Sequence, residues 1–153
     1  MPPIAYFKLQ AKNLFKDYKT KEPVFDETIN DYLYEYSPKY FDVDRIILEH
    51  DLDEENFTLM KSQHVMANMV GFRKWADLLK ASGTELELAK LLFDNQDKIH
   101  IEDWKVYVAG VENDNNITLS PDDRLKIFKK VFFEVDGHVS PFGDYRLNKK
   151  IAA

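Results

Sequence analysis

The chain has no cysteine, and this absence removes several classes of protein at once. Without thiols it cannot be a disulfide scaffold, hold zinc through thiolates or use a cysteine nucleophile. The absence also fits a reducing compartment, so we expect a cytoplasmic protein. Glycine and proline are scarce as well, with 5 and 6 among 153 residues, and this excludes a linker-like or low-complexity chain.

The scarcity of glycine also excludes the common phosphate-binding and nucleophile motifs. The sequence has no Gly-x-Ser-x-Gly elbow, no P-loop and no dinucleotide-binding glycine motif. It also lacks an apolar run of the roughly 18 residues that would cross a bilayer. We therefore expect no cofactor of these classes and no membrane partner.

Positive charge is in the minority, with 21 Lys and Arg against 27 Asp and Glu, for a net charge of −6. Such a chain lacks the overall charge for non-specific binding to nucleic acid. Apolar residues make up 44% and aromatic residues 14%, enough to build a core. The length predicts one domain over 1–153, with an insertion at 21–41 and a flexible basic tail over about 138–153.

Apolar residues recur at helical spacing along most of the chain, which predicts a mostly helical fold. The first stripe consists of Ile4, Phe7, Ala11, Leu14 and Tyr18. A second stripe, in a helix starting near Asp53, consists of Phe57, Met60, His64, Ala67 and Val70. We expect an all-α protein, a compact bundle of six or seven helices.

Helix ends are marked by residues with known capping roles. Gly71 predicts a break between two helices. Thr84 and Glu87 match a capping box, a hydroxyl followed three residues later by a carboxylate. Ser120 followed by Pro121 predicts the start of the last helix.

The insertion contains a different period. Tyr32, Tyr34 and Tyr36 alternate with other residues, which predicts a short strand paired with the segment 24–25. A small β-hairpin at about 24–36 can therefore be added to the helical bundle. Because an isolated hairpin is marginally stable, we expect it to pack on helices.

Four of the eight tyrosines gather between residues 32 and 40, namely Tyr32, Tyr34, Tyr36 and Tyr40. Tyrosine offers a large contact area at low entropic cost and is enriched at protein interfaces. The four rings predict a site for a protein partner or a second copy. The alternative is that they cover one end of the helical core.

A metal-dependent enzyme is a weaker alternative. His50 and Glu54 share a helical spacing of four, and His138 lies near acidic residues, but the two-histidine zinc helix is absent. The acidic run from Asp51 also departs from the calcium-binding loop, because Asn56 replaces the required glycine. The sequence predicts neither a metal site nor a cofactor.

Arg45 and His50 have the Arg-x4-His spacing of HEPN-type ribonucleases, and the pair resembles that motif. The resemblance implies a centre in which the cation steadies a phosphate and the imidazole moves a proton. Here Ile46 follows the arginine where those enzymes tend to have a polar residue. The motif also falls in the first third of the chain, earlier than in those enzymes.

Two further segments, 6–14 and 62–79, resemble a small bacterial helical domain known as glyoxalase-related. The resemblance is carried by the Leu-x-x-x-Ala-Lys-x-Leu and Ala-x-x-x-Gly-Phe-x-x-Trp-x-x-Leu patterns. It implies a bacterial helical fold and transfers no catalytic residue.

The Ala67-x-x-x-Gly71 spacing within the second segment is also typical of a helix-turn-helix corner. Such a corner would present Arg73, Lys74 and Lys80 to nucleic acid. A tight corner between two core helices is the favoured interpretation, because the following helix uses much of its surface for apolar residues.

The absence of motifs for catalysis and the tyrosine-rich insertion together favour a non-enzymatic interaction or regulatory module. The expected partner is another protein or a second copy of the chain. Nucleic-acid binding, through the helical corner or the Arg45 and His50 pair, is the alternative, followed by a metal-dependent enzyme.

Overall fold

The structure is a computed structural model that describes residues 1–147. The described residues form seven α-helices and two strands, with a single 3-10 turn, η1 (Glu54–Asn56), and a π-helical turn, η2 (Lys129–Phe133). In chain order the other elements are α1 (Pro3–Tyr18), β1 (Glu22–Asp26), β2 (Asp31–Glu35), α2 (Val43–Glu49), α3 (Leu59–Met69), α4 (Trp75–Lys80), α5 (Gly83–Asp94), α6 (Ile101–Asn115) and α7 (Pro121–Phe128). The mostly helical prediction is confirmed, although the term all-α leaves out the strand pair. None of the described helices is long and apolar enough to cross a membrane.

The described chain divides into two compact units, each made of two separate stretches. The first unit contains Met1–Tyr6 and Met66–Asp144. The second contains Phe7–Val65 and the chain from Tyr145 onward. The four tyrosines of the insertion and the Arg45 and His50 pair therefore belong to the second unit.

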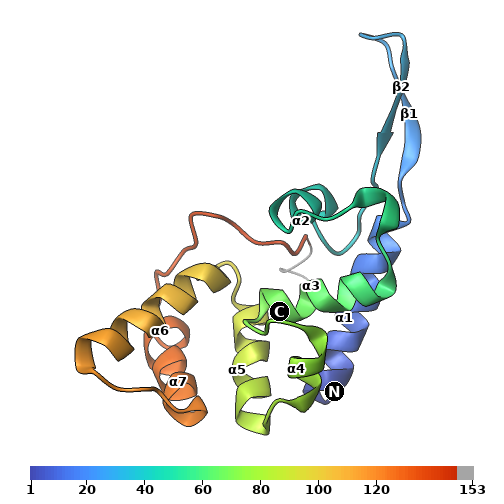
Figure 1. Ribbon diagram of the computed structural model, residues 1–153. Coiled ribbons are helices and arrows are strands. Elements are labelled where there is room, and N and C mark those ends of the chain that lie inside the picture. The colour runs from blue at the N-terminus through green and yellow to red at the C-terminus, as the bar shows by residue number, and fades with distance from the viewer. Residues whose placement is uncertain (148–153) are drawn as a thin grey trace. The chain divides into compact units, whose positions relative to one another are not determined.

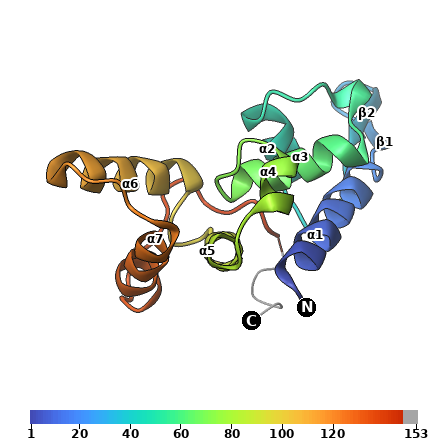
Figure 2. The ribbon, with the colours of Figure 1, turned by 60° about the horizontal axis from the view of Figure 1, so that its bottom comes forward.

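The first unit has a core of aliphatic and aromatic side chains from α5, α6, α7 and the π-helical turn. Trp104 on α6 meets Phe128 and Phe132 edge to face, with ring centroids 5.3 and 5.8 Å apart. α6 and α7 lie side by side in both ribbon views (Figure 1, Figure 2). These edge-to-face contacts add to the burial of large apolar surfaces and fix the pair of helices.

Two of the three predicted helix-end signals are confirmed. Ser120 caps α7 by accepting the Asp123 N–H at 3.1 Å, and Pro121 occupies the first helical position, as predicted. Gly71 has a φ of +95°, so the break after α3 uses a backbone region that favours glycine. The capping box at Thr84 is wrong: Ser82 is the cap, and its reciprocal partner is Glu85.

The predicted stripe of α3 is also wrong in part. The helix begins at Leu59, where the hydroxyl of Thr58 accepts the Lys61 N–H at 3.2 Å, so Phe57 lies outside the helix. The set of residues that lies on the buried side of α3 therefore differs from the predicted set. Met60 and His64 are exposed, whereas Ser62 is buried and donates to the Ala11 carbonyl at 2.6 Å.

In the second unit, α1 buries the stripe that its sequence predicted, including Phe7, Ala11 and Leu14. The chain after α7 returns to this unit through Tyr145, which is buried. The Tyr145 carbonyl accepts the Asp42 N–H at 2.8 Å, and the Leu147 N–H donates to the Tyr40 carbonyl at 2.9 Å. The described end of the predicted flexible tail is thus fixed by backbone pairing, and residues 148–153, which hold Lys149 and Lys150, lie outside the described residues.

Candidate protein-binding hairpin

β1 and β2 form an antiparallel hairpin with a four-residue turn. The paired residues are Glu22 with Glu35, Pro23 with Tyr34, Val24 with Leu33, Phe25 with Tyr32 and Asp26 with Asp31. The turn is supported by Asp26, whose carboxylate accepts the Thr28 N–H at 2.8 Å, and by Asn30, which has a φ of +52°. Asn is among the few non-glycine residues that adopt this conformation readily, so the turn chemistry agrees with the observed register.

The register separates the side chains into two faces of different chemistry. Because side chains alternate along a strand, residues paired across the hairpin share a face. One face is apolar and aromatic throughout: Pro23, Phe25, Tyr32 and Tyr34. We call this the aromatic face, and the rings of Phe25 and Tyr32 meet there edge to face at 5.4 Å.

The opposite face, which we call the acidic face, has two apolar residues between four carboxylates. Its members are Glu22, Val24, Asp26, Asp31, Leu33 and Glu35. Together with Glu27 in the turn, residues 22–35 carry five acidic side chains and no Lys or Arg. The hairpin therefore combines apolar surface with concentrated negative charge.

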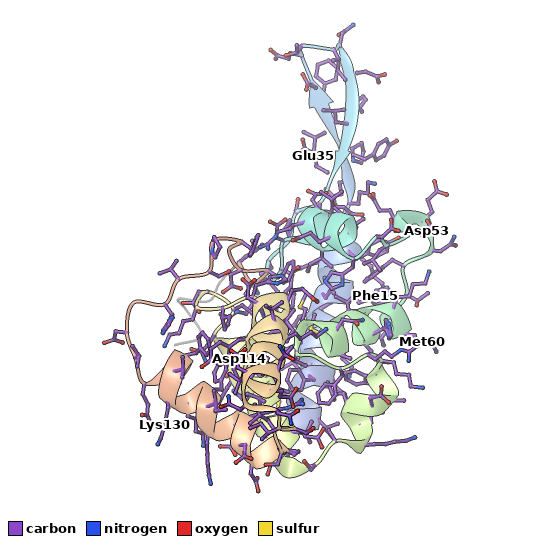
Figure 3. All side chains as sticks on the ribbon, turned by 60° about the vertical axis from the view of Figure 1, so that its left-hand side comes forward. Phe15, Glu35, Asp53, Met60, Asp114 and Lys130 are labelled. Carbon is purple, nitrogen blue, oxygen red and sulfur yellow. The ribbon has the colours of Figure 1, made fainter. Side chains whose placement is uncertain are left out.

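Both faces are exposed. Tyr32 and Tyr34 expose 58% and 67% of their surface, and Val24, Phe25 and Leu33 are also exposed. In Figure 1 the hairpin extends away from α2 and from the end of α1, and in Figure 3 its side chains project on both sides of the ribbon beyond Glu35. The expectation that this hairpin packs on helices is wrong for residues 22–35.

The base of the hairpin is held by a buried carboxylate. Asp17, which exposes 2% of its surface, accepts the backbone N–H groups of Lys39, Tyr40 and Phe41 at 2.8 to 2.9 Å. Thr20, just after α1, adds a further bond to the base, because its hydroxyl accepts the Ser37 N–H at 2.8 Å. These bonds join the end of α1 to the chain that returns from β2, and they fix both ends of the hairpin.

A second group of contacts, which we call the root, packs the first residues outside the strands. The Tyr36 ring packs against the Tyr18 ring in a tilted arrangement, with centroids 6.1 Å apart, and the Lys21 ammonium lies 5.3 Å from the Tyr36 ring centroid. The Lys21 ammonium pairs with the Glu54 carboxylate of η1, and the Tyr18 hydroxyl donates to the Glu54 carbonyl. The root therefore ties the hairpin to η1 through an ion pair and to α1 through the contact between Tyr36 and Tyr18.

Two side chains of the root, Glu54 and Tyr36, have pKa values that differ from their ordinary values. The hydrogen bond from Lys21, and then the Tyr36 hydroxyl, hold the pKa of Glu54 below its ordinary value. Burial and the nearby Glu54 carboxylate raise the pKa of Tyr36. Both shifts favour the ionised Glu54 and the neutral Tyr36 that are present at pH 7.

The four predicted tyrosines thus separate into two pairs. Tyr32 and Tyr34 are exposed on the aromatic face. Tyr36 and Tyr40 are half-buried, with Tyr36 in the root and Tyr40 hydrogen-bonded through its N–H to Asp17. The core-covering alternative therefore fits Tyr36 and Tyr40, and the interface stays a prediction for Tyr32 and Tyr34. Phe25 and Leu33 are exposed residues that the tyrosine pattern alone did not include.

Arg45 and His50 both lie against the ring of Tyr145. The Arg45 guanidinium lies 4.3 Å from the Tyr145 ring centroid, and the His50 ring centroid is 5.8 Å from it. Arg45 also pairs with Glu49, with Nε 2.6 Å from Oε2. A phosphate bound by Arg45 would compete with this ion pair and with the aromatic contact.

The remaining histidines have local contacts of their own. His100 caps α6, with Nδ1 accepting the Glu102 N–H at 3.2 Å, and His138 lies 5.0 Å from the ring of Phe132. Within residues 1–147, no three His, Asp or Glu side chains are grouped so that they could hold a metal ion.

The first unit contains a hollow of about 350 Å³ that the sequence did not predict. Its lining includes the core residues Leu92 and Trp104 and contains no histidine or hydroxyl side chain. The two acidic residues of the lining already accept hydrogen bonds, Glu85 from Ser82 and Glu112 from the Leu119 N–H at 2.7 Å. The lining also contains two cations, Lys105 and Arg124, and Arg124 lies 3.5 Å from the Glu112 carboxylate.

The corner after Gly71 leads into α4, which has only six residues. Arg73 and Lys74 are exposed but precede the helix, and Leu78 within it is buried. A recognition helix in a helix-turn-helix reads bases from its N-terminal residues while it lies in the major groove. The short α4 offers little such surface.

No family model, curated protein or solved structure matches the chain. The resemblance of segments 6–14 and 62–79 to the glyoxalase-related domain stays a prediction.

Proposed function

We propose that this protein is a non-enzymatic interaction module that binds a protein partner through its hairpin. The observation that carries the proposal is the combination of an exposed apolar hairpin and a firmly held base. Exposed contiguous apolar surface is typical of interaction sites in soluble proteins. Tyrosine and phenylalanine are also among the residues that contribute most to binding at such sites.

The anchored base supports the proposal in a second way. Three hydrogen bonds to Asp17 and the contacts of Tyr36 hold the hairpin in place before any partner arrives. A binding element that is already ordered loses less conformational entropy on association. The hairpin is therefore presented as a preorganised surface.

A different protein is favoured over a second copy by charge. Residues 22–35 have five carboxylates and no cation, and the whole chain has a net charge of −6. Two such hairpins facing each other would place like charges in contact, which disfavours association.

Site-specific photo-crosslinking in cells that produce the protein tests the proposal. The photoreactive residue benzoylphenylalanine is placed at Tyr34 in one version and, as a control, at Val106 of α6, which has a similar exposed fraction of 71%. We expect a discrete adduct from position 34 that is absent from position 106. We also expect Phe25→Ser to abolish this adduct without lowering the melting temperature.

Two outcomes contradict the proposal. Equal labelling from positions 34 and 106 means that the hairpin has no particular partner, and a missing adduct at position 34 means that it has none under the conditions of growth. An adduct that contains two differently tagged copies of this chain replaces the different partner with self-association.

A further inference from the structure

We infer that the partner contributes an extended, positively charged segment that pairs with the free edge of β2 as a third strand. This inference rests on the proposed function and names the chemistry of the partner. Addition of a strand to an exposed sheet edge is a common mode of peptide recognition, in which backbone bonds provide affinity and side chains provide specificity. Three features of the hairpin lead to this mode and to this charge.

The first feature is the difference between the two edges. In an antiparallel pair, residues alternate between those whose backbone groups face the neighbouring strand and those whose groups face outward. Pro23 has no N–H, and the Tyr32 N–H donates to the carboxylate of its neighbour Asp31 at 2.7 Å. Both observations indicate that the backbone groups of Pro23 and Phe25 point away from β2. By the same pairing, the backbone groups of Tyr32 and Tyr34 point away from β1.

The two edges therefore differ in their donors. The β1 edge offers one outward N–H, that of Phe25, because proline occupies the other outward position. The β2 edge has two outward N–H groups, and in the described part of the chain the sheet has no third strand beside it. A partner strand can therefore accept hydrogen bonds from two backbone N–H groups along β2, but from only one along β1.

The second feature is the state of the β2 edge without a partner. Asp31 occupies one of its two outward donors, and charged residues at an edge are a known means of preventing unwanted strand pairing. A partner strand must displace this carboxylate from the Tyr32 N–H. The displacement costs least when the partner brings a cation that the freed carboxylate can pair with.

The third feature is the pattern of side chains along β2. A third strand places its alternate residues beside Asp31, Leu33 and Glu35 on the acidic face. Cationic residues suit the two outer positions and an apolar residue suits the central one. On the aromatic face, Tyr32 and Tyr34 accept apolar or planar cationic side chains. The partner is therefore a basic–apolar–basic sequence with one residue between each.

A titration of the full-length protein with a synthetic peptide tests this inference. The probe is the acetylated and amidated heptapeptide Thr-Lys-Thr-Val-Thr-Lys-Thr, followed by the amide signals in nitrogen–proton correlation spectra. We expect the largest shifts at Tyr32 and Tyr34, with the helical signals unchanged. The same peptide with alternate backbone nitrogens methylated, or with Glu in place of Lys, is expected to bind at least tenfold more weakly.

A charge-reversed protein provides the matched variant. Asp31→Lys together with Glu35→Lys changes two exposed side chains, and unchanged helical signals verify that it folds. We expect this variant to prefer the glutamate peptide over the lysine peptide, reversing the order of the original chain.

Each contrary outcome has a definite meaning. Equal binding of the methylated peptide overturns strand pairing, and equal binding of the glutamate peptide overturns the basic partner. A dimer joined through β2 without peptide makes a second copy the occupant and also overturns the inference. If the peptides fail while the Tyr34 adduct persists, strand addition is wrong and the proposed function stands, whereas loss of that adduct overturns both.

Discussion

Two groups of aromatic side chains in this molecule have similar contacts and opposite surroundings. On the hairpin, Phe25 meets Tyr32 edge to face at 5.4 Å, and both rings are exposed. In the first unit, Trp104 meets Phe128 in the same geometry at 5.3 Å, and both are buried. The geometry of a ring pair therefore does not distinguish a buried core from an exposed surface. The distinction lies in what else covers the rings, namely the other core residues of the first unit in one case and solvent in the other.

The comparison is tested most strongly by Phe128→Ala in the buried group. Phe128 exposes 0% of its surface, so its removal leaves a cavity as well as losing burial, and we expect a loss of about 4 kcal/mol in the free energy of unfolding. Urea denaturation followed by circular dichroism measures this loss. Phe25→Ala is the matched control on the hairpin, with an expected loss below about 1 kcal/mol. Similar losses for the two variants would remove the distinction between the groups.

The base of the hairpin is tested by Asp17→Ala. Three backbone N–H groups lose their acceptor in a buried place, and we expect the free energy of unfolding to fall by about 3 kcal/mol. The control is Asp26→Ala, which removes a single exposed hydrogen bond in the turn and is expected to cost under about 1 kcal/mol. A loss for Asp17→Ala no larger than that of the control contradicts the role assigned to this carboxylate.

The root is tested by Glu54→Gln across a range of pH. Because the folded pKa of Glu54 lies below its ordinary value of 4.5, its contribution to stability is complete above pH 4.5 and is lost as the pH falls through the lowered pKa. We expect the variant to be less stable by under about 1 kcal/mol at pH 7, since the Lys21 pair is partly exposed. Thermal unfolding at pH 7 and pH 3 should give a difference between the two proteins that shrinks at the lower pH. A difference that grows on acidification would contradict the lowered pKa of Glu54 in the folded protein.

The smallest effect on stability is expected for Tyr32→Ser combined with Tyr34→Ser. Both rings are exposed, so the free energy of unfolding should change by less than about 0.5 kcal/mol. With the photoreactive residue moved to position 25, the double variant should nevertheless lose its adduct. A stability loss above 2 kcal/mol would place these rings with the buried group.

The sequence predicted elements better than it predicted surfaces. The period of two at Tyr32, Tyr34 and Tyr36 identified the hairpin, because alternation is a local property of a strand. It did not show which tyrosines are exposed, because the burial of Tyr36 depends on Tyr18 and Glu54, which are distant in sequence. Burial arises from contacts that no local period contains.

Helix starts show the same limit at smaller scale. Ser82 with Glu85 and Thr84 with Glu87 both match the capping box, and only the first pair is used. In α3, the apolar Phe57 suggested an earlier start, and the resulting error in phase placed Met60 and His64 on the buried side. Asp17 gave no local signal at all, because its partners Lys39, Tyr40 and Phe41 lie more than twenty residues away.

The bonds at Asp17 and Thr20 have a consequence for how this protein can vary. They join the two ends of the hairpin to each other and to α1. The length and sequence of residues 22–35 are therefore nearly independent of the helices. The entropic cost of closing a loop rises by only about 0.6 kcal/mol for each doubling of its length. Residues 22–35 can therefore become longer, shorter or differently charged without a change in the helices that hold them.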